Sequence, residues 1–253
     1  AAHWTAGRSG AARFVTVRGE RGIGKSRLVA EFRGQVASAD TTVLAVRCTQ
    51  FAKNSAFLPV IELPERVLGL VGATEPQERL GRIDQQLAAL GIRAPDAAPL
   101  LAALLSIPVA ERYPALELSP TRRRVRTIET LVAIIEAIAS RNPTILVAED
   151  LHWADPATLD VLEALVSRAR RLPLLGVFTA RPEFEAGWPD DEAAALVDVS
   201  RLDHAEVEAV VRHVAHGKPV PGDVIREITQ RCDGVPLFIE EVARAVIEAG
   251  VLQ

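Results

Sequence analysis

FVTVRGERGIGKSRL, residues 14–28, carries the strongest structural signal in this chain. It opens with strand-like alternation, continues with the glycine-rich GERGIGKS, and takes on apolar spacing suited to a helix from Lys25. The stretch matches G-x-x-x-x-G-K-[ST], with Gly19, Gly24, Lys25 and Ser26 at the defining positions. A glycine-rich turn can arise by chance, but a full match between a strand and a helix strongly favours a loop that holds phosphate groups.

The chemistry of a phosphate site explains the residue types in this loop. Glycine permits positive φ and lets backbone N–H groups approach phosphate oxygens without a Cβ in the way, which accounts for Gly19, Gly22 and Gly24. Lys25 can place its charge between the β- and γ-phosphates, while the Ser26 hydroxyl can complete a magnesium shell. The loop residues expected to bind the nucleotide are Gly19, Glu20, Arg21, Gly22, Ile23, Gly24, Lys25, Ser26 and Arg27.

The composition is that of an ordinary globular protein. Its 253 residues can form one large domain, or a core domain with a smaller one. Apolar residues make up 49% and charged residues 25%, and no apolar run approaches the roughly 20 residues of a membrane helix. The net charge of -4 lacks the basic excess of a dedicated nucleic-acid binder. We therefore expect neither membrane insertion nor direct nucleic-acid binding.

The two cysteines, Cys48 and Cys232, are far apart in the sequence and show no paired spacing. We expect buried thiols in a reducing compartment, hence a cytoplasmic protein in which they form neither a disulfide nor a metal site. The sequence contains no methionine, so we also expect it to be a piece of a longer polypeptide.

A second motif, NPTILVAEDLHWADPATLDVLEAL, spans residues 142–165. The apolar run from Ile145 to Ala148 is typical of a strand that is buried on both faces of a parallel sheet. Glu149 and Asp150 follow at its carboxyl end, where ligands bind in open α/β sheets. One acid can hold magnesium while the other orients or deprotonates an attacking water. Two acids can also merely end a strand, but beside the phosphate loop the pair favours a catalytic role.

The rest of the chain completes an alternating α/β pattern. Arg181 follows an apolar strand, where an arginine can sense a γ-phosphate. Asp155 before Pro156 predicts an N-cap and a helix start. The predicted strands are residues 14–17, 41–48, 145–148, 174–179 and 196–199. The predicted helices are residues 25–38, 78–90, 97–105, 121–140, 203–214 and 223–231, with a last one in DGVPLFIEEVARAVIEAG.

Three segments leave their roles open. Residues 1–13, which contain Trp4 and a Gly/Ser/Ala/Arg stretch, are expected to be an entry segment, and prolines divide residues 49–118 into an irregular helical insertion. The arginines at 122–126 can face phosphate or a neighbouring subunit, but a solvated helix face is the favoured interpretation. His213 and His216 share a helix face without further ligands nearby, so we do not expect a metal there.

With these motifs in place, the chain resembles the signal transduction ATPases with numerous domains, the STAND group of P-loop NTPases. Within that group it is most similar to the Orc1-like AAA ATPase modules fused to bacterial cyclases, protein kinases or transcription regulators. GERGIGKSRL resembles the group's Walker A motif, and ILVAEDLHWADP resembles Walker B with its LHWAD extension. FTARPE resembles the sensor strand, and DGVPLFIEEV resembles the G-x-P lid motif.

This resemblance implies an α/β fold of the ASCE P-loop NTPase type. A five-stranded parallel sheet flanked by helices would have its sensor strand between the Walker A and Walker B strands, followed by a C-terminal helical lid. The implied division is a core at residues 1–200 and a lid at 201–253. Residue by residue, Lys25, Glu149, Asp150 and Arg181 would be catalytic, Ser26, Glu149 and Asp150 would serve Mg²⁺, and Pro236 would lie beside the adenine. Glu149 stands where many relatives have Asp, so the metal contact can be mediated by water or can fall to Asp150.

The function expected from the resemblance is a regulatory switch that binds ATP or ADP with Mg²⁺ and hydrolyses ATP slowly. Its partners would be effector domains of the same polypeptide, of cyclase, kinase or DNA-binding type, and nucleotide-dependent self-association stays open. The alternative is a DNA-associated AAA+ ATPase, against which the acidic charge argues. A small-molecule kinase has no recognisable acceptor pocket, and the absence of an [NT]-K-x-D motif argues against a GTPase.

Overall fold

The computed structural model describes residues 2–36, 38–52, 55–109, 112–188, 193–216 and 219–248. The chain forms two compact units, each made of two segments. The first unit comprises Ala1–Thr16 and Val36–Leu196, and the second comprises Val17–Gln35 and Val197–Gln253.

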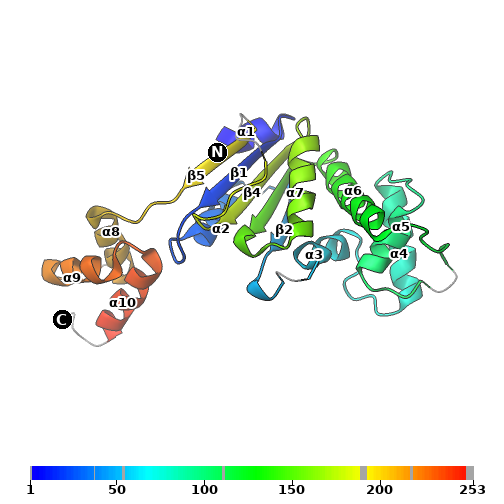
Figure 1. Ribbon diagram of the computed structural model, residues 1–253. Coiled ribbons are helices and arrows are strands. Elements are labelled where there is room, and N and C mark those ends of the chain that lie inside the picture. Colours follow the sequence, from blue (N-terminus) through cyan, green and yellow to red (C-terminus); the bar gives the residue numbers. More distant parts are fainter. Residues whose placement is uncertain are drawn as a thin grey trace. The chain divides into compact units, whose positions relative to one another are not determined.

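The strands form a five-stranded parallel sheet in the order β2-β3-β4-β1-β5 (Figure 1). Their bounds are β1 Arg13–Arg18, β2 Thr42–Arg47, β3 Thr144–Glu149, β4 Leu174–Ala180 and β5 Ala194–Asp198. The register places Thr42 opposite Thr144, and Thr144 opposite Leu174. Strand β4, which resembles the sensor strand, therefore lies between β3 and β1, as the resemblance implied.

The central strands are buried as their apolar runs predicted. Every residue of β4 is buried, and in β3 only the last residue, Glu149, is partly exposed. Close packing inside the first unit depends on Gly176, because a Cβ there would lie 2.5 Å from Cδ1 of Phe14. The missing side chain leaves room for the rings of Phe14 and Phe178, whose centres are 6.1 Å apart.

The helices of the first unit extend its hydrophobic core beyond the sheet. They are α1 Ala2–Arg8, α3 Leu58–Val67, α4 Pro76–Ala89, α5 Ala97–Leu104, α6 Pro120–Ala139 and α7 Pro156–Arg168, with short 3₁₀ turns η1 Gln50–Ala52 and η2 Leu151–Trp153. α5 packs against both α4 and α6 (Figure 1). Leu80, Leu101 and Ile134 belong to the same buried cluster as Phe178, so the helical insertion shares the core of the sheet.

The entry segment contains a helix that the sequence did not predict. Residues 2–8 form α1, with Trp4 buried. α1 packs against β4, and a Cβ on Gly7 would lie 3.2 Å from the Leu174 carbonyl oxygen. Tertiary packing stabilises this short helix, since its sequence has no apolar period of its own.

The second unit contains α2 Lys25–Val36, whose last residue falls in the first unit, and a bundle of α8 His204–Val214, α9 Gly222–Cys232 and α10 Pro236–Glu248. Asp203 and Glu206 form a capping box that starts α8, which confirms the predicted helix start. The three bundle helices pack on one another around Val207, Ile228 and Ile239. In the described ranges, no helix is both long and apolar enough to cross a membrane.

Candidate functional site

The phosphate-loop sequence adopts the strand, loop and helix that it predicts. β1 leads into the loop, and α2 begins at Lys25. Gly22 and Gly24 have φ angles of 79° and 98°, which residues with a Cβ rarely adopt. Gly19 is needed for space, because a Cβ there would lie 2.9 Å from Cγ2 of Ile23.

Lys25 is a buried cation within the loop. Its Nζ donates hydrogen bonds to the carbonyl oxygens of Gly19 at 2.7 Å and Glu20 at 2.8 Å, and 8% of the residue is exposed. These bonds hold a flexible ammonium across the backbone of its own loop. Ser26 is exposed on the first turn of α2, where the helix N-terminus favours anions. The loop thus fits a phosphate ligand.

The predicted lid, at residues 201–253, contacts the predicted phosphate loop inside the second unit. The backbone N–H of Leu237, next to Pro236, donates to the Gly22 carbonyl at 3.2 Å. Arg201 donates to both carboxylate oxygens of Glu20, at 3.0 and 2.9 Å. These contacts place the start of α10, and with it the predicted lid proline, next to the loop.

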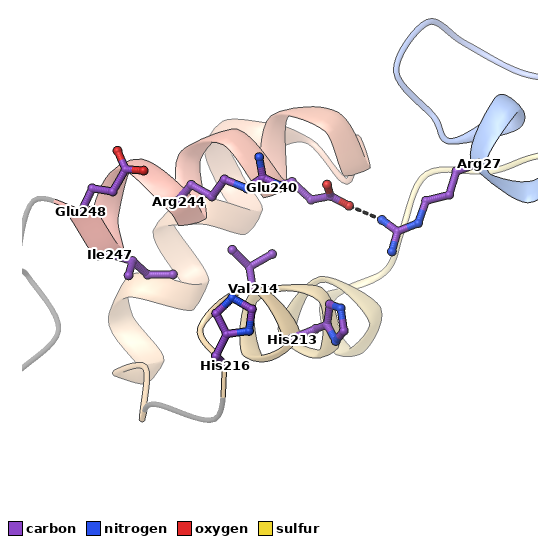
Figure 2. A pocket seen from close by; sticks show the side chains of 8 residues that line it. All are labelled: Arg27, His213, Val214, His216, Glu240, Arg244, Ile247 and Glu248. Carbon is purple, nitrogen blue, oxygen red and sulfur yellow. Dashed lines mark hydrogen bonds and ion pairs between the residues drawn. The ribbon is translucent and has the colours of Figure 1, made fainter. Parts of the chain in front are cut away.

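A third contact borders a hollow of about 360 Å³ between the start of α2 and the lid helices α8 and α10 (Figure 2). The Arg27 guanidinium forms an ion pair with the Glu240 carboxylate (Figure 2). His213 and His216 both line this hollow. Within the described residues, no group of three or more His, Cys, Asp or Glu side chains could hold a metal ion.

The paired acids stand at the end of β3 in the first unit. Glu149 is the last residue of the strand, and Asp150 follows in the left-handed region with φ 60° and ψ 45°. The Asp150 N–H donates to the hydroxyl of Thr179, which is fully buried in β4, at 2.9 Å. Non-glycine residues seldom adopt this region, although aspartate does so more often than most, and such residues cluster at active sites. The sequence motifs did not single out Thr179, although it stands two residues before Arg181.

Arg181 follows β4 in the same unit. Its guanidinium carbon lies 5.3 Å from the centre of the Trp153 ring. Its Nη1 also lies 3.9 Å from Oε1 of Glu183, beyond hydrogen-bonding distance. The predicted phosphate sensor therefore neighbours both the aromatic residue of the LHWAD sequence and a carboxylate that it does not hydrogen-bond.

Asp155 has a larger structural role than the predicted N-cap. Its carboxylate accepts hydrogen bonds from the N–H groups of Ala157 at 2.9 Å and Thr158 at 3.2 Å, which confirms the cap of α7. The Thr158 hydroxyl donates to it at 2.5 Å, and the backbone N–H of Phe57 donates at 3.0 Å. Because Phe57 precedes α3, one buried carboxylate ties the helical insertion to the turn that follows the paired acids.

Carboxylates near the end of β3 also contribute to the raised pKa of a neighbouring thiol, that of Cys48. Cys48 follows β2, and its backbone N–H donates to the Glu149 carbonyl at 2.9 Å. Burial raises the pKa of Cys48 to about 12, with smaller contributions from the carboxylates of Asp155 and Asp150. The carboxylates of Asp155 and Asp150 therefore lie close enough to this thiol to disfavour its ionised form. Cys48 and Cys232 are buried and free, as predicted for the thiols.

The arginines at the start of α6 pair largely within their own unit. Arg124 donates to Asp160, and Arg126 donates to Asp96 through two nitrogens. The Arg126 guanidinium lowers the pKa of Asp96. Arg122 and Arg123 are exposed. These pairs agree with the solvated helix face that the sequence favoured.

The predicted site residues fall into two sets. Gly19 to Arg27 and Pro236 belong to the second unit, while Glu149, Asp150 and Arg181 belong to the first. Each set is locally ordered by the bonds described above. The convergence of both sets on one triphosphate stays a prediction.

Comparisons with known proteins place these motifs in context. A family model described as AAA ATPase domain matches residues 1–177. An uncharacterized protein of Rhizobium meliloti strain 1021 is 29% identical over 250 residues, covering 96% of this chain and 24% of that protein. The chain thus spans about a quarter of the length of this relative.

Solved structures also resemble the chain. A STAND protein with a tetratricopeptide repeat sensor from Pyrococcus horikoshii matches with a TM-score of 0.47 and 14% identity, over 93% of this chain and 28% of that one. Drosophila ORC bound to DNA matches with a TM-score of 0.41 and 8% identity, over 94% of this chain and 56% of that one.

Proposed function

Because the chain belongs to the AAA ATPase domain family, we propose that it is a regulatory ATPase module that binds ATP with Mg²⁺ and hydrolyses it slowly. The lid would respond to the nucleotide state, and effector domains of a longer polypeptide would respond to the lid. The family membership agrees with the AAA resemblance of the sequence motifs.

The observation that carries this proposal is the direct contact between loop and lid. Leu237 N–H donates to the carbonyl of Gly22, and a Cβ at Gly22 would lie 3.2 Å from Cβ of Leu237. A phosphate group entering the loop therefore acts on backbone that the lid already contacts. If this contact differs between the nucleotide-bound and nucleotide-free states, the nucleotide can shift the equilibrium between two positions of the lid.

The residues have distinct roles in this mechanism. Lys25 and the loop N–H groups would bind the phosphates, and Arg181 would contact the terminal phosphate. Asp150 would orient or deprotonate the attacking water. Bound Mg²⁺, which prefers oxygen ligands, would neutralise charge that develops on the phosphates, and Ser26 and Glu149 would hold it. The oxygen donors of Ser26, Glu149 and Asp150 suit that ion.

The proposal is tested by nucleotide titration of Lys25→Ala. Loss of the buried ammonium should abolish ATP binding measured by calorimetry, because no other lysine occurs in the loop. Arg212→Ala is the matched control, since it removes a positive charge from the exposed face of α8. Equal ATP affinity in wild type and Lys25→Ala would contradict the proposal. Salt-sensitive binding to duplex DNA would instead favour a DNA-associated ATPase.

A further inference from the structure

Arg181 and Trp153 come from neighbouring parts of the first unit. Arg181 follows the fully buried strand β4, and Trp153 ends η2, the turn directly after Asp150. The separation of 5.3 Å between the guanidinium carbon and the ring centre is within the roughly 6 Å limit of a cation-π contact. The pair therefore joins the predicted phosphate sensor to the motif that carries the paired acids.

Trp153 is positioned by its own backbone. Its N–H donates to the Asp150 carbonyl at 2.8 Å, and the next N–H, of Ala154, donates to the Leu151 carbonyl at 2.9 Å. Leu151 anchors the turn with 1% of its surface exposed. The His152 ring lies 5.0 Å from the indole. The indole also packs against the buried core, so it is more restrained than the arginine, a long side chain with many rotamers.

The aromatic contact leaves the arginine able to bind phosphate. A cation over a ring face needs no hydrogen-bond acceptor, so its N–H donors can still reach phosphate oxygens. Glu183 differs, because a carboxylate would compete with phosphate for those donors. Its side chain is 67% exposed and its Oε1 lies 3.9 Å from Nη1, so the competing pair is weak.

We propose that Trp153 is a positioning residue that holds Arg181 ready for the terminal phosphate and thereby sets the preference of the chain for ATP over ADP. The inference rests on the proposed function, in which Arg181 contacts the γ-phosphate. Ordering a long side chain before binding lowers the entropy lost when the phosphate arrives. ADP has no γ-phosphate, so its affinity gains nothing from this ordering.

The test is a double-mutant cycle on nucleotide affinity in the full chain. Calorimetry gives the ATP and ADP dissociation constants of wild type, Trp153→Leu, Arg181→Ala and the double variant. Trp153→Leu should weaken ATP binding by about 3- to 10-fold, the size of a partly exposed cation-π contact, and leave ADP binding unchanged. In the Arg181→Ala background the same change should have no further effect, because its partner is gone.

Two matched variants separate positioning from general packing. Trp153→Phe keeps an aromatic face and should restore most of the ATP preference, whereas Trp188→Leu removes another indole, one that packs on Phe178. Trp188→Leu should leave the ratio of ATP to ADP affinity unchanged. Equal losses of ATP and ADP affinity in Trp153→Leu would overturn the inference, as would a further loss of ATP affinity in the Arg181→Ala background.

The cycle also separates this inference from the proposed function. If Arg181→Ala removes the ATP preference and Trp153→Leu does not, only the role of Trp153 is wrong. If wild type binds ATP and ADP equally, the sensor role of Arg181 fails together with the inference. A spectroscopic readout is the emission of wild type minus that of Trp153→Phe, which should change with ATP and not with ADP.

Discussion

Asp155 shows how one buried side chain can organise a functional turn. It is 1% exposed and accepts hydrogen bonds both from the first turn of α7 and from the backbone of Phe57. Phe57 itself has a left-handed conformation with φ 63°. A residue with a Cβ pays for that conformation, so the hydrogen bond to Asp155 helps to maintain it.

Asp155→Ala should therefore destabilise the chain more than the loss of an ordinary cap. We expect the free energy of unfolding to fall by about 2 to 4 kcal/mol, because lost capping adds to the cost of stranded buried N–H groups. Asp203→Ala is the matched control, since it removes an exposed N-cap, and it should cost about 1 kcal/mol. Urea unfolding measures both, and similar losses would show that the bond to Phe57 contributes nothing.

The raised pKa of Cys48 predicts that the folded chain loses stability at alkaline pH. Its pKa is raised from an ordinary value of 9.0 to about 12, so the folded chain keeps its proton where the unfolded chain has lost it. Below pH 9 both states hold the proton, and stability does not depend on this group. Between about pH 9 and 12 unfolding releases a proton, so stability falls as pH rises.

Cys48→Ala should flatten that decline, as measured by urea unfolding at a series of pH values. Tyr113→Phe serves as the comparison, because the pKa of Tyr113 is also raised, from 10.0 to about 12, mainly by burial and by Asp84. Its effect should begin about one pH unit higher than that of Cys48. An unchanged decline in Cys48→Ala would mean that the thiol is accessible in the folded chain.

At the scale of elements, two different properties of glycine matter where the loop meets the lid. Gly22 has positive φ and lies against the lid, with Leu237 and Val235 atoms 3.2 Å from where a Cβ would be. Gly24 has positive φ but open space around it, and Gly34, inside α2, has open space and no positive φ. Substitutions at these three positions therefore distinguish the effect of backbone strain from the effect of contact with the lid.

Alanine at these three positions should give a graded series in thermal unfolding. Gly34→Ala should stabilise by about 0.5 to 1 kcal/mol, because alanine favours helices. Gly24→Ala should destabilise by about 1 to 2 kcal/mol through strain alone. Gly22→Ala should cost more than Gly24→Ala, since the methyl group also displaces the lid. Equal losses of stability at Gly22 and Gly24 would mean that the lid moves away from the added methyl group at no cost in free energy.

The sequence predicted elements well where periodicity is local and failed where a distant partner decides. Strand β3 and helix α6 were predicted within a few residues, because the apolar run at 145–148 and the stripe at 121–140 are readable alone. Helix α1 was missed because burial of Trp4 against other elements stabilises it. The contacts of Thr179, Phe57 and Leu237 join residues far apart in sequence, so no spacing could reveal them.

For the whole molecule, the chain forms two units, and the phosphate loop belongs to the same unit as the lid. Exposed ion pairs such as Arg201 with Glu20 contribute little stability each. A nucleotide can contribute more, about 2.7 kcal/mol at a hundredfold excess over Kd. The balance between lid states should therefore follow the bound nucleotide and not the weak contacts of the free chain.

The variant Asp150→Asn tests whether the state of the lid follows the bound nucleotide. The neutral amide cannot take the proton of an attacking water, so the variant should bind ATP like wild type and lose turnover by about a hundredfold or more. Under excess ATP its small-angle scattering profile should stay in the ATP state, while the wild-type profile drifts to the ADP state as phosphate is released. Lys25→Ala should keep the nucleotide-free profile throughout. If Glu149→Gln stops hydrolysis and Asp150→Asn does not, the two acids have exchanged roles, and identical profiles for ATP and ADP would leave the lid without a switching function.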